Sequence, residues 1–351
     1  MILSPPVRDN DSRKGAEREG AHILFSCARC AVFVLFVFAS FVLGGCQPTD
    51  PKPNLTHTPT DTWGAFVKRV DKLSGPDLYY ETQGQGSPVL FVHAFANNLS
   101  TWADVRGPLS RDHKLWMLDL KGFGRSPKPD DGHYSIYDHA AQVIRFIRRH
   151  DLSQLTLVGH SMGGGVVLAV SLYLIEHEPD RIVRLVLIDS AAYPQSLPIF
   201  LKLLQLPLLP DLLGPVLSKK WLVRMLLQRL YYNDALIRDA DVDTLAMAFA
   251  QPGASRALIQ TGRQIRPKDH REISRRYTDI TLPTVILWGR EDIIVPIAMG
   301  ERLHRAIKGS EFIILKGCGH MPQGECPQRT AAIIEKFLQQ HEANELVRLN
   351  K

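Results

Sequence analysis

The sequence has 351 residues, of which 45% are hydrophobic and 22% are charged, and its formal net charge is +6 at pH 7. This composition is typical of a globular protein and excludes a fibrous or wholly disordered chain. Because no basic run is interleaved with aromatic residues, we expect no nucleic-acid partner.

The N-terminal part of the chain has the organisation of an export signal. Residues 1–29 are polar and charged, which predicts disorder, and residues 30–43 form an uninterrupted apolar run. Such a run is too short to span a bilayer comfortably as a helix but suits the core of a signal peptide. The run ends in Leu-Gly-Gly-Cys46, which resembles the lipobox of bacterial lipoproteins.

That resemblance implies cleavage before Cys46, a lipid anchor on this cysteine and a membrane-anchored protein of the bacterial cell envelope. An uncleaved N-terminal membrane anchor is the alternative, and it also places the rest of the chain outside the cytoplasm. We therefore assign residues 1–45 to a signal segment. Residues 46–62 are rich in Pro and Thr and are predicted to be an extended tether.

The remainder of the chain alternates between apolar strands and helices. Residues 66–73 and 78–82 alternate as edge strands would, whereas continuous apolar runs predict buried strands. Buried strands are expected at residues 88–93, 115–119, 155–158 and 183–188, further strands at 284–288 and 311–315, and helices at 135–149, 166–175 and 327–340. This order predicts an α/β fold with a mostly parallel sheet and helices on both faces.

A long insertion interrupts this alternation between residues 194 and 277, where no buried strand is expected. Residues 197–230 contain fourteen leucines, and several prolines divide them into short helical pieces. We interpret residues 194–277 as a helical cap over the carboxyl ends of the strands, where open α/β sheets bind ligands. The cap would divide a core of residues 63–193 and 278–341, followed by a tail of residues 342–351. Its leucines predict an apolar substrate pocket and a preference for medium-chain acyl groups. The alternative is that these leucines pack on the core and on one another.

One stretch carries the strongest chemical signal. Residues 159–163 read Gly-His-Ser161-Met-Gly, directly after a predicted strand and before a predicted helix. This G-x-S-x-G turn holds a serine hydroxyl clear of the sheet in a strained backbone, where a base and a substrate can both reach it. Ser161 is therefore the candidate nucleophile.

From about residue 64 to residue 340 these features resemble the α/β-hydrolase superfamily, whose triad follows the order nucleophile, acid, histidine. Trp-Gly-Arg-Glu-Asp292 looks like the acid loop of that superfamily, and Gly-Cys-Gly-His320-Met-Pro looks like its histidine loop. The resemblance implies that His320 is the base and that Asp292 orients it. Glu291 and the strand-end Asp189 are alternative candidates for the acid.

The same resemblance implies an oxyanion hole built from the backbone N–H groups of Met162 and Phe95. Phe95 follows His93-Ala94, in which Ala94 stands where the superfamily usually has glycine, and this restricts the backbone beside the nucleophile. We expect no cofactor and no metal ion.

The five cysteines give no zinc-site spacing, and the pair Cys27 and Cys30 is interpreted as incidental. Cys318 and Cys326 flank the histidine loop. An exported protein permits a disulfide between them, and two buried free thiols are the alternative.

These features predict a serine hydrolase that cleaves acyl esters of the carboxylesterase or lipase type through an acyl-enzyme. Its expected partners are a small-molecule or lipid ester and the membrane. The serine nucleophile argues against the relatives that hydrolyse epoxides and haloalkanes, which use a carboxylate there. A serine-dependent carbon–carbon bond hydrolase, or a non-catalytic binding protein on the same fold, are the alternatives.

Overall fold

The computed structural model describes residues 62–196, 198, 201–202 and 218–349. The predicted signal segment, Cys46, nearly all of the tether and much of the leucine-rich stretch lie outside these residues. Among the described helices, none combines the length and the apolar character that crossing a membrane requires.

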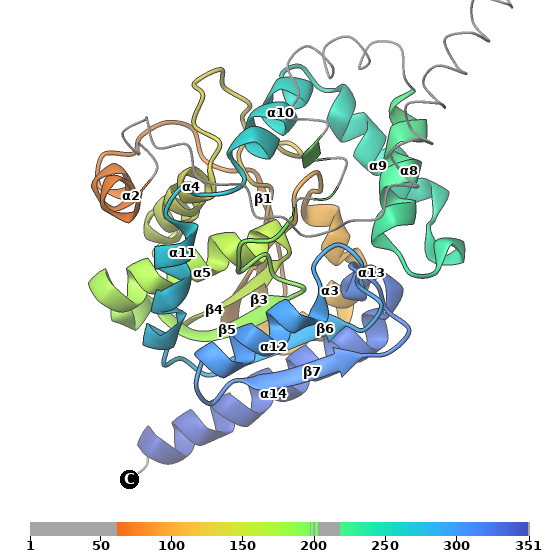
Figure 1. The fold of residues 1–351 in the computed structure, drawn as a ribbon. Helices are drawn as coiled ribbons and strands as arrows, with labels where there is room; N and C mark the ends of the chain where they lie inside the picture. The colour runs from red at the N-terminus through yellow and green to blue at the C-terminus, as the bar shows by residue number, and fades with distance from the viewer. Residues whose placement is uncertain (1–61, 197, 199–200, 203–217, 350–351) are drawn as a thin grey trace, which may run out of the picture. The chain divides into compact units, whose positions relative to one another are not determined.

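A seven-stranded sheet forms the centre of the fold (Figure 1). Its strands are β1 (Tyr80–Gln83), β2 (Ser87–Val92), β3 (His113–Leu118), β4 (Leu155–His160), β5 (Ile182–Ile188), β6 (Thr284–Gly289) and β7 (Glu311–Leu315). The spatial order is β1-β3-β2-β4-β5-β6-β7, and only the β1–β3 pairing is antiparallel among the described strands. The predicted α/β fold with a mostly parallel sheet is therefore confirmed. The six strands predicted after residue 87 are all present, and β7, at the edge of the sheet, is only partly buried.

Helices cover both faces of the sheet, which explains why the central strands are apolar on both sides. One face packs against α2 (Trp63–Val70), α4 (Ile136–Arg149), α5 (Met162–His177) and α12 (Ile297–Ala306). The other packs against α3 (Ala103–Leu109) and α14 (Pro327–Leu349). Strand β2 shows the alternation directly, since Leu90 and Val92 enter the first core and Val89 and Phe91 enter the second.

The edge strand predicted for residues 66–73 is wrong, because α2 occupies most of this stretch. Phe66 and Val70 lie four residues apart and therefore share one helical face, which is buried. The ring of Phe66 stacks on Tyr137 of α4 at 5.2 Å and meets Tyr173 of α5 edge-on at 5.7 Å. A short apolar pattern fits the spacing of either a helix or a strand, and these tertiary contacts decide in favour of the helix. The edge strand β1 begins later, at Tyr80.

The described part of the predicted cap lies between β5 and β6 and is helical. It contains α8 (Lys219–Leu230), α9 (Asp239–Ala250), α10 (Ala254–Gln264) and α11 (His270–Ile273). Helices α8, α9 and α10 lie together, apart from the helices that flank the sheet (Figure 1). Val223 and Leu227 of α8 pack on Val242 and Leu245 of α9 in a small core of their own. Part of the leucine content is thus used within the cap itself.

Candidate active site

The nucleophile candidate sits at the sharp turn between β4 and α5. Ser161 has φ 53° and ψ −119°, a backbone conformation that non-glycine residues rarely adopt. Its N–H donates to the carbonyl of Ile188 at 2.9 Å, and its own carbonyl accepts from Ala191 at 2.9 Å, so neighbouring β5 holds the turn. A Cβ at Gly159 would lie 2.7 Å from the carbonyl oxygen of Gly163, which explains why the turn requires glycine there.

Three buried side chains meet at this turn. The Ser161 hydroxyl lies 2.8 Å from Nε2 of His320, and Nδ1 of the same ring lies 2.7 Å from Oδ2 of Asp292. Since the carboxylate accepts from Nδ1–H, the neutral ring presents the unprotonated Nε2 to the hydroxyl. The structure thus brings together the serine, the histidine and the acid that the sequence suggested, in the relative arrangement of a nucleophile, a base and an orienting carboxylate.

The acid loop after β6 holds Asp292 in this position. Its Oδ1 accepts two backbone N–H groups, from Ile294 at 2.7 Å and Val295 at 3.0 Å. The alternative acid Glu291 lies elsewhere, because its Oε2 accepts from the N–H groups of Gly317 and Cys318 at 2.8 and 3.2 Å. Glu291 therefore joins the acid loop to the histidine loop and does not contact the ring of His320 in the described structure.

His160, the residue before Ser161, is hydrogen-bonded to the loop that carries His320. Its Nε2–H donates to the backbone carbonyl of His320 at 2.7 Å, and its Nδ1 accepts from the side-chain amide of Gln323 at 3.1 Å. Burial, followed by the neighbouring His320, holds the pKa of His160 well below its usual range, so its ring stays neutral. The serine motif leaves the residue before the serine unspecified, so the sequence indicates no role for His160 or Gln323.

The histidine loop is also fixed by the cap. The backbone N–H of His320 donates to the carbonyl of Leu230, at the end of α8, at 2.8 Å. The carboxylate of Glu325, in the short helix α13 (Pro322–Glu325), accepts from the N–H groups of Gly319 at 2.9 Å and Tyr232 at 2.7 Å. Glu325 is buried and ties the loop that carries the base to the chain that follows α8. Sequence spacing gives no sign of this contact.

Cys318 and Cys326 form a disulfide across the same loop, with their Cα atoms 6.3 Å apart. Both cysteines are buried, and Nη2 of Arg329 contacts both sulfur atoms. Of the two states that the sequence left open, the structure therefore contains the bonded one. The bond closes the short segment that includes His320 and Glu325.

Phe95 and Met162, the candidate oxyanion donors, both line the pocket beside Ser161. Met162 is the first residue of α5, and the first N–H groups of a helix have no acceptor within the helix. His93 fixes the loop that leads to Phe95, since its Nε2 accepts from the N–H of Leu120 at 2.9 Å and its Nδ1–H donates to Ala94 at 2.7 Å. Both ring nitrogens of His93 are thus satisfied in the neutral form, and burial lowers its pKa.

The pocket above Ser161 is mostly apolar. Its walls include five leucines, of which four are on the cap helices α8 and α9: Leu201, Leu226, Leu227, Leu230 and Leu245. Among the described lining residues none carries a carboxylate, and Arg266 is the one that carries a permanent positive charge. The guanidinium of Arg266 donates to the carbonyl of Gln195 and has no carboxylate partner in the described structure. Such a pocket fits an apolar substrate with a neutral or anionic end.

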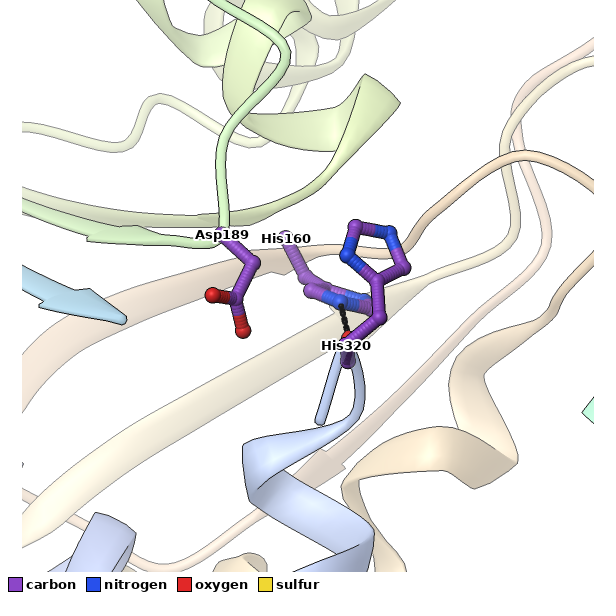
Figure 2. A group of neighbouring side chains, drawn as sticks. All are labelled: His160, Asp189 and His320. Atoms are coloured by element: carbon purple, nitrogen blue, oxygen red, sulfur yellow. Dashed lines mark hydrogen bonds between the residues drawn. The ribbon is translucent and has the colours of Figure 1, made fainter. Parts of the chain in front are cut away.

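Figure 2 shows that the side chains of His160, Asp189 and His320 lie close together, and one potential ligand atom from each lies within 4.8 Å of the others. The ring nitrogens of both histidines are already used. Those of His320 contact Ser161 and Asp292, and those of His160 contact the carbonyl of His320 and Gln323. A metal ion would have to break this network, so the donor set does not fit a resident metal.

Comparison with known proteins gives a consistent picture. The model of the alpha/beta hydrolase family matches residues 89–333. A 2-hydroxymuconate semialdehyde hydrolase from Pseudomonas putida is 29% identical over 273 residues, which cover 74% of this chain and 90% of that protein. The solved structure of the meta-cleavage product hydrolase CumD from Pseudomonas fluorescens is similar with a TM-score of 0.64 at 22% identity, covering 75% of this chain and 94% of that one. An esterase from Thermogutta terrifontis is similar with a TM-score of 0.62 at 25% identity, covering 75% and 93%.

Proposed function

The chain belongs to the alpha/beta hydrolase family, and we propose that it is a serine hydrolase with Ser161, His320 and Asp292 as its catalytic residues. The observation that carries this proposal is the continuous hydrogen-bonded chain from the serine hydroxyl through the imidazole to the buried carboxylate. A serine hydroxyl is a weak nucleophile until an adjacent base accepts its proton, and this geometry supplies that base.

The proposed reaction begins when Oγ of Ser161 attacks a carbonyl carbon while Nε2 of His320 takes the hydroxyl proton. The N–H groups of Met162 and Phe95 would stabilise the resulting oxyanion. The tetrahedral intermediate then collapses, and the electron pair of the broken bond goes to the leaving group, which takes the proton from His320. Water, deprotonated by the same imidazole, attacks the acyl-enzyme and releases a carboxylic acid and the free serine.

For the bond that is cleaved, we favour a carbon–carbon bond next to a ketone or aldehyde over the acyl ester that we expected first. Two relatives from Pseudomonas putida, at 26% and 29% identity over most of the chain, are named as hydrolases of 2-hydroxy-6-oxo-2,4-heptadienoate and 2-hydroxymuconate semialdehyde. Compounds of this kind carry a carboxylate at the end distant from the cleaved bond. The guanidinium of Arg266 at the pocket wall, which has no carboxylate partner in the described structure, is a suitable partner for that substrate carboxylate.

Acyl-ester hydrolysis is the second candidate, and the apolar lining of the pocket favours it. Leucines from α8 and α9 would surround an acyl chain, and each buried methylene contributes about 0.8 kcal/mol to binding. A neutral ester would make no use of Arg266. The two candidates therefore differ in how strongly they depend on this one side chain.

The test has two parts. A fluorophosphonate probe should label wild-type protein at Ser161 and leave Ser161→Ala unlabelled, and labelling of neither protein would contradict the serine hydrolase proposal. Steady-state kinetics should then compare a 2-hydroxy-6-oxo-dienoate with p-nitrophenyl butyrate in Arg266→Met and in the control Arg263→Met, which is exposed and outside the pocket lining.

If the substrate is the dienoate, Arg266→Met should raise KM for it at least about tenfold, because a charge-assisted hydrogen bond contributes roughly 1.5–3 kcal/mol. The KM for the neutral ester should stay within about twofold, and Arg263→Met should leave both unchanged. Turnover of the ester with no detectable dienoate cleavage would instead favour the ester candidate.

The proposal for location is that the protein is a lipoprotein of the bacterial cell envelope, tethered to a membrane through Cys46. The apolar run of residues 30–43 immediately before Leu-Gly-Gly-Cys46 supports it. A membrane-tethered enzyme would meet apolar substrates that partition into the bilayer, which agrees with the apolar pocket.

A further inference from the structure

A second buried carboxyl group lies beside the candidate triad and has no part in the mechanism above. Asp189 follows β5 directly, is fully buried, and has a left-handed backbone with φ 42°. Its Oδ1 accepts the N–H of Gly289, the last residue of β6, at 2.8 Å. Its Oδ2 is also buried, and no described N–H or ordinary O–H group donates a hydrogen bond to it.

Asp189 and Asp292 both form hydrogen bonds to this same glycine, and the two carboxyl groups interact electrostatically. The N–H of Gly289 binds the Asp189 carboxyl, while the carbonyl of Gly289 accepts the backbone N–H of Asp292 at 3.3 Å. The Asp189 carboxyl also lies within 4.8 Å of a ring nitrogen of His320 (Figure 2). The charged or titratable groups that face it are Asp292 after β6, Glu325 of α13, His160 of β4 and His320.

Two adjacent buried carboxyl groups cannot both ionise at low cost, so one of them keeps a proton. The hydrogen-bond donors decide which one. Asp292 accepts three, from the N–H groups of Ile294 and Val295 and from the ring of His320, whereas Asp189 accepts one. Donated hydrogen bonds stabilise the charged form, so the charge belongs on Asp292 and the proton on Asp189. Burial, and next the proximity of Asp292, raise the pKa of Asp189 well above its usual range.

We propose that Asp189 is a positioning residue that stays protonated and donates its O–H to the Asp292 carboxylate, so that the pair holds a single negative charge beside His320. The protonation is a property of the fold, whereas the positioning role rests on the proposed serine hydrolase function. A second charge at this distance would favour the imidazolium and leave His320 a poor base near neutral pH. The donated hydrogen bond also gives the Asp292 side chain a further fixed contact.

The proton can be located without an activity assay, by following Tm between pH 5 and pH 8 for the full chain and for Asp189→Asn. If Asp189 is protonated in the folded protein, the pKa of its carboxyl is higher in the folded than in the unfolded chain. The folded state therefore loses stability as the pH rises above the pKa of the unfolded chain. Asparagine has the same shape and needs no proton. The Tm of Asp189→Asn relative to wild type should therefore increase by roughly 5 °C over this range.

Asp279→Asn is the matched control, because Asp279 is exposed and paired with Arg276 at 3.3 Å. Its Tm difference from wild type should stay constant within about 1 °C over the same range, since an exposed carboxylate is ionised in both states. A Tm difference between Asp189→Asn and wild type that is equally constant would overturn the proposed protonation.

The positioning role is tested by the rate of fluorophosphonate labelling of Ser161 as a function of pH, which needs no known substrate. Asp189→Asn should keep the midpoint of the acidic limb within about 0.3 pH units of wild type, because the neutral amide replaces a neutral carboxyl and can donate the same hydrogen bond. If Asp189 were ionised, loss of its charge within 5 Å of the imidazole would lower this midpoint by more than about one pH unit.

Asp189→Ala removes the hydrogen-bond donor and should lower the maximal labelling rate about tenfold relative to Asp189→Asn. The probe concentration that gives half of the maximal rate should be the same in both variants. Equal maximal rates in the alanine and asparagine variants would exclude a positioning role. A wild-type protein that fluorophosphonates do not label would contradict the proposed function and the positioning role together, whereas the Tm series would still decide where the proton lies.

Discussion

Loss of the Cys318–Cys326 disulfide should measurably destabilise the protein, and the effect can be calculated from the size of the loop. The two cysteines are separated by eight positions in the sequence. The chain-entropy relation then gives a stabilisation of about 2.6 kcal/mol at 25 °C, through restriction of the unfolded chain. For a domain of this size that energy corresponds to a Tm decrease of roughly 5 °C.

The same change should lower turnover, because the bond closes the segment that carries His320. Without it, the position of the imidazole would depend on the hydrogen bonds from His320 to Leu230 and from Glu325 to Gly319 and Tyr232. These contacts remain in the variant, so we expect a decrease in kcat of about threefold to tenfold, well below the roughly hundredfold cost of a 1 Å misplacement. Substrate binding involves the pocket walls and should change little.

The assay compares wild type with the double variant Cys318→Ser, Cys326→Ser by calorimetry, with and without reductant. Reductant should lower the Tm of wild type towards that of the double variant and leave the variant unchanged, which controls for the other cysteines of the chain. If the double variant melts within about 1 °C of wild type, and reductant affects neither, the loop-closure reasoning is refuted and the two cysteines act as buried thiols.

Three further predictions concern the nucleophile, acid stability and the anchor. Ser161→Ala should lower kcat at least about a thousandfold while the Tm stays near that of wild type, and near-normal turnover would contradict the triad. Burial lowers the pKa of His93, His139 and His160, that of His139 to about 3, so their contribution to stability is present above the unfolded value near 6.5 and is lost as the pH falls. The shifts of the three histidines, partly offset by the opposite shift of Asp189, should lower the unfolding free energy as the pH falls from 6.5 to 5, by at most about 1.4 kcal/mol per pH unit for each ring. A urea midpoint that does not change from pH 7 to pH 5 would show that these rings are not neutral in the fold. Globomycin or Cys46→Ser should cause a larger precursor to accumulate in bacteria, whereas unchanged processing would indicate an uncleaved anchor or a conventional signal.

The sequence predicts the sheet well, because buried parallel strands are continuous apolar runs and each is recognisable by itself. Leu155–His160 and Thr284–Gly289 illustrate this, since both begin where the pattern places them. Helix α2 was predicted as a strand because eight residues fit either period, and only the packing of Phe66 on Tyr137 and Tyr173 decides between them. The antiparallel pairing of β1 with β3 also depends on contacts that no local pattern encodes.

The candidate triad could be proposed from the sequence because each member lies in a local motif after a strand. The residues that support it could not, since their roles arise from approaches between segments distant in the chain. His160 reaches the backbone of His320 across 160 positions, and Glu325 reaches Tyr232 across 93. Asp189 is the intermediate case. Its place at a strand end suggested a candidate acid, whereas its burial and its single backbone donor, visible only in the fold, assign it a different role.

The triad geometry itself does not distinguish an ester from a carbon–carbon bond as the substrate. In both proposed reactions Ser161 would attack a carbonyl and His320 would return one proton to the leaving group, so the demands on the base are alike. The difference is that an alkoxide carries its charge on oxygen, whereas the charge of a carbanion must be delocalised through a conjugated system onto a carbonyl oxygen before the fragment can leave. That delocalised fragment also carries the carboxylate in the dienoates, so a protein that cleaves them must hold an anion at the far wall of its pocket. In the described lining only Arg266 carries a permanent charge suited to that task. The choice between the two chemistries therefore depends on this one side chain of the pocket rather than on the catalytic residues.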